Sequence, residues 1–171
     1  DLAVAGDAPG LMIENAFYRM KLHEASGMLD EVTIKAKPEL TFVHKKETNG
    51  AIQWNPDCYA PPRPWVHLSD WETGTHNYQY AETRGPVTVR TRRWGDMRFM
   101  PELACSMEFE LYAGVPWFRM RSAMHVKGTI DAQALRNAEV VFAREAFSEA
   151  AWWDVFHNRV ETRHIIAAPD L

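Results

Sequence analysis

Hydrophobic and polar side chains alternate along much of this chain, in the pattern of half-buried β-strands. The clearest run spans residues 103–112, whose apolar positions all fall on one face of the predicted strand. These positions are Leu103, Cys105, Met107, Phe109 and Leu111. A turn at 113–116 separates this run from a second alternating run at 117–125, so we expect the two to pair as an antiparallel hairpin. A third run at 86–94 places Val87, Val89 and Thr91 on one face.

Shorter strands are expected at 11–13, 17–23, 29–36, 40–44 and 51–54, with glycine-containing turns at 24–27 and 45–50. The stretch at 55–64 holds four prolines and is expected to be an ordered loop rather than a strand. Two short helices are expected near the C-terminus, at 131–136 and 148–154, because Asp131 and Ser148 are good N-caps. Together these patterns predict an all-β antiparallel sandwich with one or two short helices.

Length and charge narrow the class of protein. A chain of 171 residues fits one domain, which we expect to span 1–171 and to bury about two-thirds of its unfolded surface. The N-terminus has neither an initiator Met nor a signal pattern, so we expect a segment of a larger polypeptide. The formal net charge of -4 argues against nucleic acid as a partner. No apolar run approaches the length of a membrane span, so no membrane partner is expected.

The two cysteines, Cys58 and Cys105, neither require nor exclude a disulfide. A structural zinc site is not expected, since the chain holds no C-x-x-C pair. A serine-centred triad has no support either, because no G-x-S-x-G turn is present. We therefore expect no cofactor.

Residues 65–82 are the most informative stretch, because they read as a hairpin with one aromatic and titratable face. Alternation separates Val66 and Leu68 from the other face, and 72–75 forms the predicted loop. The expected pairs on the shared face are Trp71 with His76, Ser69 with Tyr78, His67 with Tyr80, and Trp65 with Glu82. Aromatic walls with groups that move protons suit a sugar ligand. The alternative is that a second layer covers this face and satisfies its polar groups internally.

A metal site from His67, His76 and Glu82 is conceivable, but cross-strand histidine pairs without further ligands are more often ordinary polar contacts. A second candidate feature is the arginine-rich face of the strands at 86–94 and 117–125. It could recognise carboxylate ligands, since arginine donates two parallel hydrogen bonds to a carboxylate. We favour the alternative, in which the arginines form a cross-strand ladder of ion pairs with Glu108 and Glu110. The arginines are Arg90, Arg92, Arg119 and Arg121.

Residues 13–32 carry a Glu-Asn pair, an aromatic strand with a basic residue, a glycine turn and a second strand. This order resembles the opening strands of galactose-mutarotase-like β-sandwich domains, and the stretches at 84–90 and 108–121 are similar to the same class. That class includes domains of polysaccharide lyases, exo-acting rhamnogalacturonan-lyase-like proteins and retaining α-mannosidases. The resemblance covers roughly residues 11–142 and implies a supersandwich-like fold. Its motifs are structural, and no family catalytic motif matches residue by residue.

We therefore expect a carbohydrate-active domain, favouring a polysaccharide lyase that acts on an acidic, uronate-containing glycan. The alternatives are a non-catalytic carbohydrate-binding or accessory sandwich and a sugar epimerase or mutarotase. Such a chain would be secreted or periplasmic and would work with further domains or a partner subunit. The candidate catalytic residues are His76, Tyr78, His67, Arg63 and Asn77, and the candidate sugar-binding residues are Trp65, Trp71, Tyr80 and Glu82.

Overall fold

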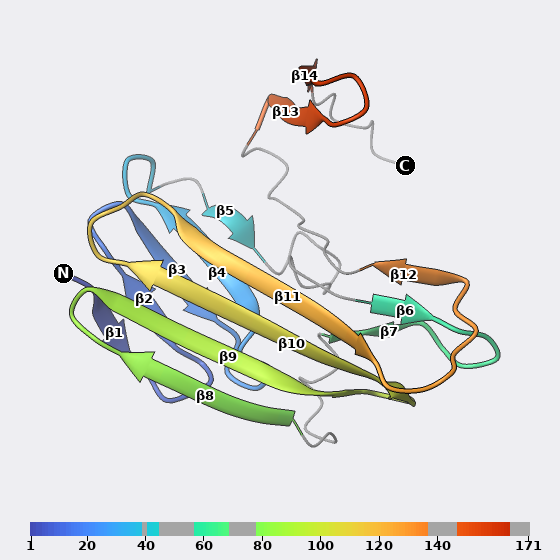
Figure 1. Cartoon of the computed structure of the whole chain (residues 1–171). Helices are drawn as coiled ribbons and strands as arrows, with labels where there is room; N and C mark the ends of the chain where they lie inside the picture. The colour runs from blue at the N-terminus through green and yellow to red at the C-terminus, as the bar shows by residue number, and fades with distance from the viewer. Residues whose placement is uncertain (39–40, 45–56, 69–77, 137–146, 165–171) are drawn as a thin grey trace.

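The computed structural model describes residues 1–38, 41–44, 57–68, 78–136 and 147–164. Within these ranges the regular structure is almost entirely β-strand, arranged in antiparallel sheets (Figure 1). The all-β prediction is therefore confirmed.

The first sheet has the strand order β1(Ala3–Ala5), β2(Met12–Glu14), β3(Tyr18–Leu22), β4(Leu29–Ile34), β5(Thr41–His44). Alternation sets its inner face, because Tyr18, Met20 and Leu22 are buried while the residues between them are exposed. The turn between β3 and β4 contains Gly27, whose φ of 67° lies in the left-handed region that favours glycine. The predicted glycine turn at 24–27 therefore joins the strands as expected.

The second sheet contains the longest strands, in the order β11(Phe118–Val126), β10(Met100–Tyr112), β9(Thr88–Met97), β8(Tyr78–Arg84). β10 and β11 pair along the predicted hairpin, with Phe109 opposite Met120. The predicted parity also holds on β9, where Val89 and Thr91 are buried. Val87 precedes the strand and is exposed.

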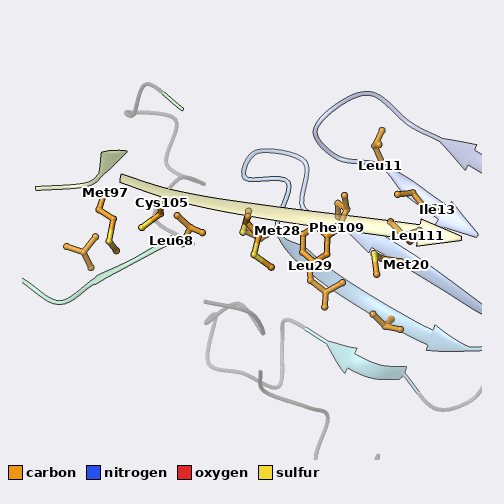
Figure 2. Close-up of a cluster of buried hydrophobic side chains, with 14 of the residues drawn as sticks. Leu11, Ile13, Met20, Met28, Leu29, Leu68, Met97, Cys105, Phe109 and Leu111 are labelled. Atoms are coloured by element: carbon orange, nitrogen blue, oxygen red, sulfur yellow. The ribbon is translucent and has the colours of Figure 1, made fainter. Parts of the chain in front are cut away.

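The two sheets face each other and enclose one apolar cluster, which makes the molecule a β-sandwich (Figures 1 and 2). The first sheet supplies residues such as Ile13, Met20 and Leu29, and the second supplies Met107 and Phe109. Figure 2 also shows Leu68 beside Cys105 and Met97 at one end of the cluster. Burial of this apolar surface between the sheets is the main force that holds them together.

The buried side-chain amide of Asn15 links the two sheets by hydrogen bonds at one edge of the sandwich. The Asn15 side-chain oxygen accepts hydrogen bonds from the backbone N–H groups of Phe17 and Tyr18, at 2.8 and 3.0 Å. Its amide nitrogen donates to the carbonyls of Tyr112 and Val115, at 2.8 and 3.0 Å. The turn after β2 is thereby joined to the turn between β10 and β11.

Two smaller sheets complete the described structure. One has the order β12(Ala134–Arg136), β6(Asp57–Tyr59), β7(Val66–His67), and the other pairs β13(Glu149–Asp154) with β14(Arg159–His164). Both helix predictions are wrong, since β12 and β13 occupy these segments. The cap residues that suggested helices also suit turns, and the backbone of each segment finds a partner strand elsewhere in the chain.

The predicted pairing of residues 65–71 with 76–82 is also wrong where the structure describes it. β7 pairs with β6, which places His67 opposite Asp57. β8 instead pairs with β9 in the larger sheet, which places Tyr80 opposite Arg93. The face assignment holds, because Val66 and Leu68 are buried and Trp65 is exposed. Alternation sets which face is buried, but it does not choose the partner strand.

Candidate functional site

The small sheet gathers five polar and aromatic residues that we call the His67 cluster: Asp57, Tyr59, Trp65, His67 and Arg136. Strand register explains why they meet. Asp57 lies opposite His67 on β7 and opposite Arg136 on β12, so both side chains flank the same carboxylate. Trp65 precedes β7, two residues before His67, and therefore shares its face.

A fully buried carboxylate lies at the centre of the His67 cluster. Asp57 accepts a hydrogen bond from Arg136 Nε at 3.0 Å, and Arg136 Nη2 lies 2.6 Å from Asp57 Oδ2. His67 Nδ1 lies 3.5 Å from the same oxygen. Because a buried carboxylate is costly unless it is paired, Arg136 and His67 are held near Asp57.

Aromatic rings form the wall beside these charges. Tyr59 and Trp65 stack almost parallel, with ring centroids 5.2 Å apart, and the His67 ring lies 6.4 Å from Trp65. The Arg136 guanidinium lies 5.3 Å from the Trp65 ring centroid, at cation–π distance. The Trp65 side chain remains 41% exposed, so apolar indole surface borders the imidazole and the guanidinium.

This arrangement is suited to proton transfer. The negative charge of Asp57, 3.5 Å from Nδ1, attracts a proton to that nitrogen, which leaves Nε2 to accept a proton from a substrate. His67 is about one-third exposed at its side chain, so a solute can approach it. The His67 cluster therefore combines an oriented base, a fixed guanidinium and an exposed aromatic ring.

Arg63 has a protein partner in this structure. Its Nη1 and Nη2 donate to the two carboxylate oxygens of Glu102, each at 2.7 Å. The Arg63 guanidinium lowers the pKa of Glu102 to about 2. This fork connects the loop before β7 to the start of β10.

Tyr78, Tyr80 and Glu82 lie on β8, in a different sheet from His67. The Tyr78 hydroxyl donates to the Ala25 carbonyl at 2.7 Å, and the Tyr78 ring centroid lies 3.5 Å from the buried Arg93 guanidinium. The Tyr80 hydroxyl donates to Glu82, and burial followed by this contact raises the pKa of Tyr80. The contact between Tyr78 and Ala25 joins β8, at the edge of the larger sheet, to the turn between β3 and β4 in the first sheet.

The epimerase alternative required Glu82 and a histidine to face each other across a sugar. Glu82 instead accepts hydrogen bonds from Tyr80 and Arg84, at 2.5 and 2.7 Å. The candidate residues Trp71, His76 and Asn77 lie outside the described residues. Their convergence stays a prediction.

Sequence reasoning missed Asp57, Tyr59 and Arg136. Asp57 and Tyr59 lie in the proline-rich stretch that was expected to be a loop, and Arg136 lies in a segment expected to be helical. None of the three has a local signal that links it to His67, because prolines hid the strand character of β6, and β12 reaches β6 from 79 residues along the chain. The alternation around Trp65 and His67 was the one usable signal.

The described residues include no group of three or more His, Cys, Asp or Glu side chains able to hold a metal ion. Across the same residues, no helix is long and apolar enough to cross a membrane. Comparisons with family models, curated proteins and solved structures found no match to this chain. The fold defines its class as an antiparallel β-sandwich, and the arguments for function come from its side chains.

Proposed function

We propose that this domain binds a uronate-containing glycan at the His67 cluster and cleaves it by β-elimination. The observation that carries the proposal is the buried Asp57 carboxylate, which lies beside His67 Nδ1 and fixes Arg136 next to the exposed Trp65 ring. These groups match the needs of the reaction, which are a base, a positive charge near the substrate carboxylate and a surface for the sugar ring.

In the proposed elimination, His67 acts first as the general base and then as the general acid. Nε2 takes the proton from the carbon next to the substrate carboxylate. The electrons of that C–H bond form a carbon–carbon double bond, and the bond to the glycosidic oxygen breaks. The imidazolium then returns its proton to the leaving oxygen. The products are an unsaturated uronate and a shortened glycan, so atoms and charge balance without a co-reactant.

The other members of the cluster have supporting roles. The Arg136 guanidinium stays paired with Asp57, but its side chain is 42% exposed and donates hydrogen bonds to the substrate carboxylate, whose charge grows as the carbon proton leaves. Asp57 is a positioning residue, because it acts through His67 and Arg136. Trp65 packs against the apolar face of a sugar ring.

The test is to incubate the whole chain with a panel of uronate-containing polysaccharides and to follow the ultraviolet absorbance of unsaturated ends. We expect His67→Ala to lower turnover by about 100-fold or more, as for loss of general acid–base catalysis. Its melting temperature should change little, because His67 is partly exposed. His157→Ala is the matched control, since His157 is an exposed histidine on the β13–β14 hairpin, and it should retain full turnover.

A non-catalytic carbohydrate-binding module is the second candidate, favoured by the stacking of Trp65 on Tyr59 beside a fixed guanidinium. Binding of oligosaccharides that is weakened in Trp65→Ala, without new unsaturated ends, would establish this candidate and reject the lyase. Absence of any binding across the panel would reject both.

A further inference from the structure

The larger sheet has a groove over β8–β11 on its outer face, opposite the face that packs on the apolar core. Strand register places Gln79, Trp94, Ser106 and Ala123 in one row across the four strands. Because Ala104, Ser106 and Ala123 on β10 and β11 are small, the taller side chains beside them border an open groove of about 480 Å³. This volume lies within the range of small-molecule sites. We call it the Trp94 groove.

The groove combines an aromatic wall with polar groups. Trp94 is half-buried, and the Arg92 guanidinium lies 5.2 Å from its ring centroid. Gln79, Ser106 and His125 add hydrogen-bonding groups to the lining, and the carboxylate of Asp96, also in the lining, is ion-paired with Lys127 at 2.5 Å. A flat apolar ring surrounded by such groups matches the alternating apolar and hydroxyl-bearing surfaces of a sugar.

Arg92 differs from the other arginines on this face. Arg90 and Arg121 pair with Glu108, and Arg119 pairs with Glu110, which confirms the predicted cross-strand ladder for these three arginines but not for Arg92. Arg92 forms no ion pair with any carboxylate of the described residues, although it lies directly opposite Glu108 in register. Its exposed guanidinium stands between the groove and a second hollow of about 180 Å³, to which it also contributes. An uncompensated positive charge therefore lies where the two hollows meet.

We propose that the Trp94 groove is a second binding site, specific for a uronic-acid residue within an oligosaccharide. Trp94 packs against the sugar ring, and Arg92 donates two parallel hydrogen bonds to the planar carboxylate. A lysine ammonium could not match this bidentate geometry. The second hollow takes the neighbouring sugar. This site shares only its ligand class with the proposed function at the His67 cluster, so it stands whether or not the chain cleaves glycans.

The test is calorimetric titration of the Trp65→Ala/His67→Ala double variant, in which the His67 cluster is disabled, with a tetrasaccharide of galacturonic acid. We expect one site, and a loss of affinity of about tenfold or more in Arg92→Gln, since hydrogen bonds to charged groups contribute that much. Ala123→Trp should abolish binding by filling the hollow, while leaving Trp94 and the core untouched. Arg119→Gln is the matched control on the same face, and it should keep full affinity because Arg119 lies in the ladder.

Specificity is tested with a neutral glucose tetrasaccharide and a sulfated one of equal length. The proposal requires the uronate ligand to bind most tightly. Equal affinity for the neutral ligand would overturn the role of Arg92, and unchanged affinity in both Arg92→Gln and Ala123→Trp would overturn the site. Binding in the double variant, together with no unsaturated products from the original chain on the same ligand, would reject the lyase and leave this inference intact.

Discussion

At the scale of single residues, the Arg63–Glu102 fork shows how an ion pair can position a loop that carries site residues. The loop from Ala60 to Trp65 connects β6 to β7 and therefore sets where His67 emerges. Both carboxylate oxygens of Glu102 accept hydrogen bonds from Arg63, a geometry with more directional strength than a single contact. Arg63 was predicted to meet a substrate carboxylate, and in this structure it meets a carboxylate of the protein.

This ion pair predicts a pH dependence of stability. The folded-state pKa of Glu102 is lowered from 4.5 to about 2, so the pair stabilises the fold above the unfolded-state value, and that contribution is lost as pH falls from about 4.5 to about 2. In Glu102→Gln, the loss of melting temperature over this pH range should be smaller than in the original chain. Glu24→Gln, at an exposed turn residue, is the control and should follow the original curve. Identical curves for all three proteins would contradict the assignment.

At the scale of elements, the turn between β3 and β4 depends on one glycine. A side chain at Gly27 would meet Pro9 Cβ at 3.0 Å and the Arg93 side chain at 3.3 Å, and the backbone there has a positive φ. Gly114, in the turn between β10 and β11, has nothing within 4 Å of the same hypothetical atom. The two glycines therefore form a matched pair within one molecule.

We expect Gly27→Ala to lower the free energy of unfolding by about 1 kcal/mol or more, because both left-handed strain and crowding oppose the new methyl group. Gly114→Ala should change it by less than about 0.5 kcal/mol, as is usual for exposed positions. Urea denaturation of both variants gives the comparison. A smaller loss in Gly27→Ala than in Gly114→Ala would contradict this account of the turn.

At the scale of the whole molecule, the two sheets are held by a shared apolar layer rather than by covalent links. Cys58 and Cys105 are both buried free thiols. Burial raises the pKa of the Cys105 thiol to about 12, so it behaves as part of the core. Phe109 lies in the middle of the longest strand and is 1% exposed, which makes it a direct probe of the layer (Figure 2).

Replacing Phe109 by Ala should lower the free energy of unfolding by about 3–5 kcal/mol, through lost burial and the cavity left behind. The control is Phe99→Ala, since Phe99 is more than half exposed. Chemical denaturation followed by circular dichroism measures both. A cost for Phe109→Ala no larger than that for Phe99→Ala would mean that the two sheets do not share this core.

Local patterns in the sequence were sufficient to predict the fold class and the buried faces of β7, β9 and β10. Residues 103–112 alternate so regularly that burial of Phe109 and Met107 followed from the two-residue period of a strand. The same period placed Val66 in the core and Trp65 outside it. These features are local, because each depends only on the spacing of apolar residues along one strand.

The pairing of β6, β7, β8 and β12 was not predictable from local patterns, and pairing determines which side chains meet. His67 was expected opposite Tyr80, but β7 pairs with β6 and meets Asp57 instead. Arg136 reaches the same carboxylate from a segment that was expected to be helical. A strand's own alternation is compatible with several partners, so it does not distinguish pairing of β7 with β6 from pairing of β7 with β8. The buried faces could therefore be read from the sequence, whereas the His67 cluster and the Trp94 groove emerged only when the sheets were assembled.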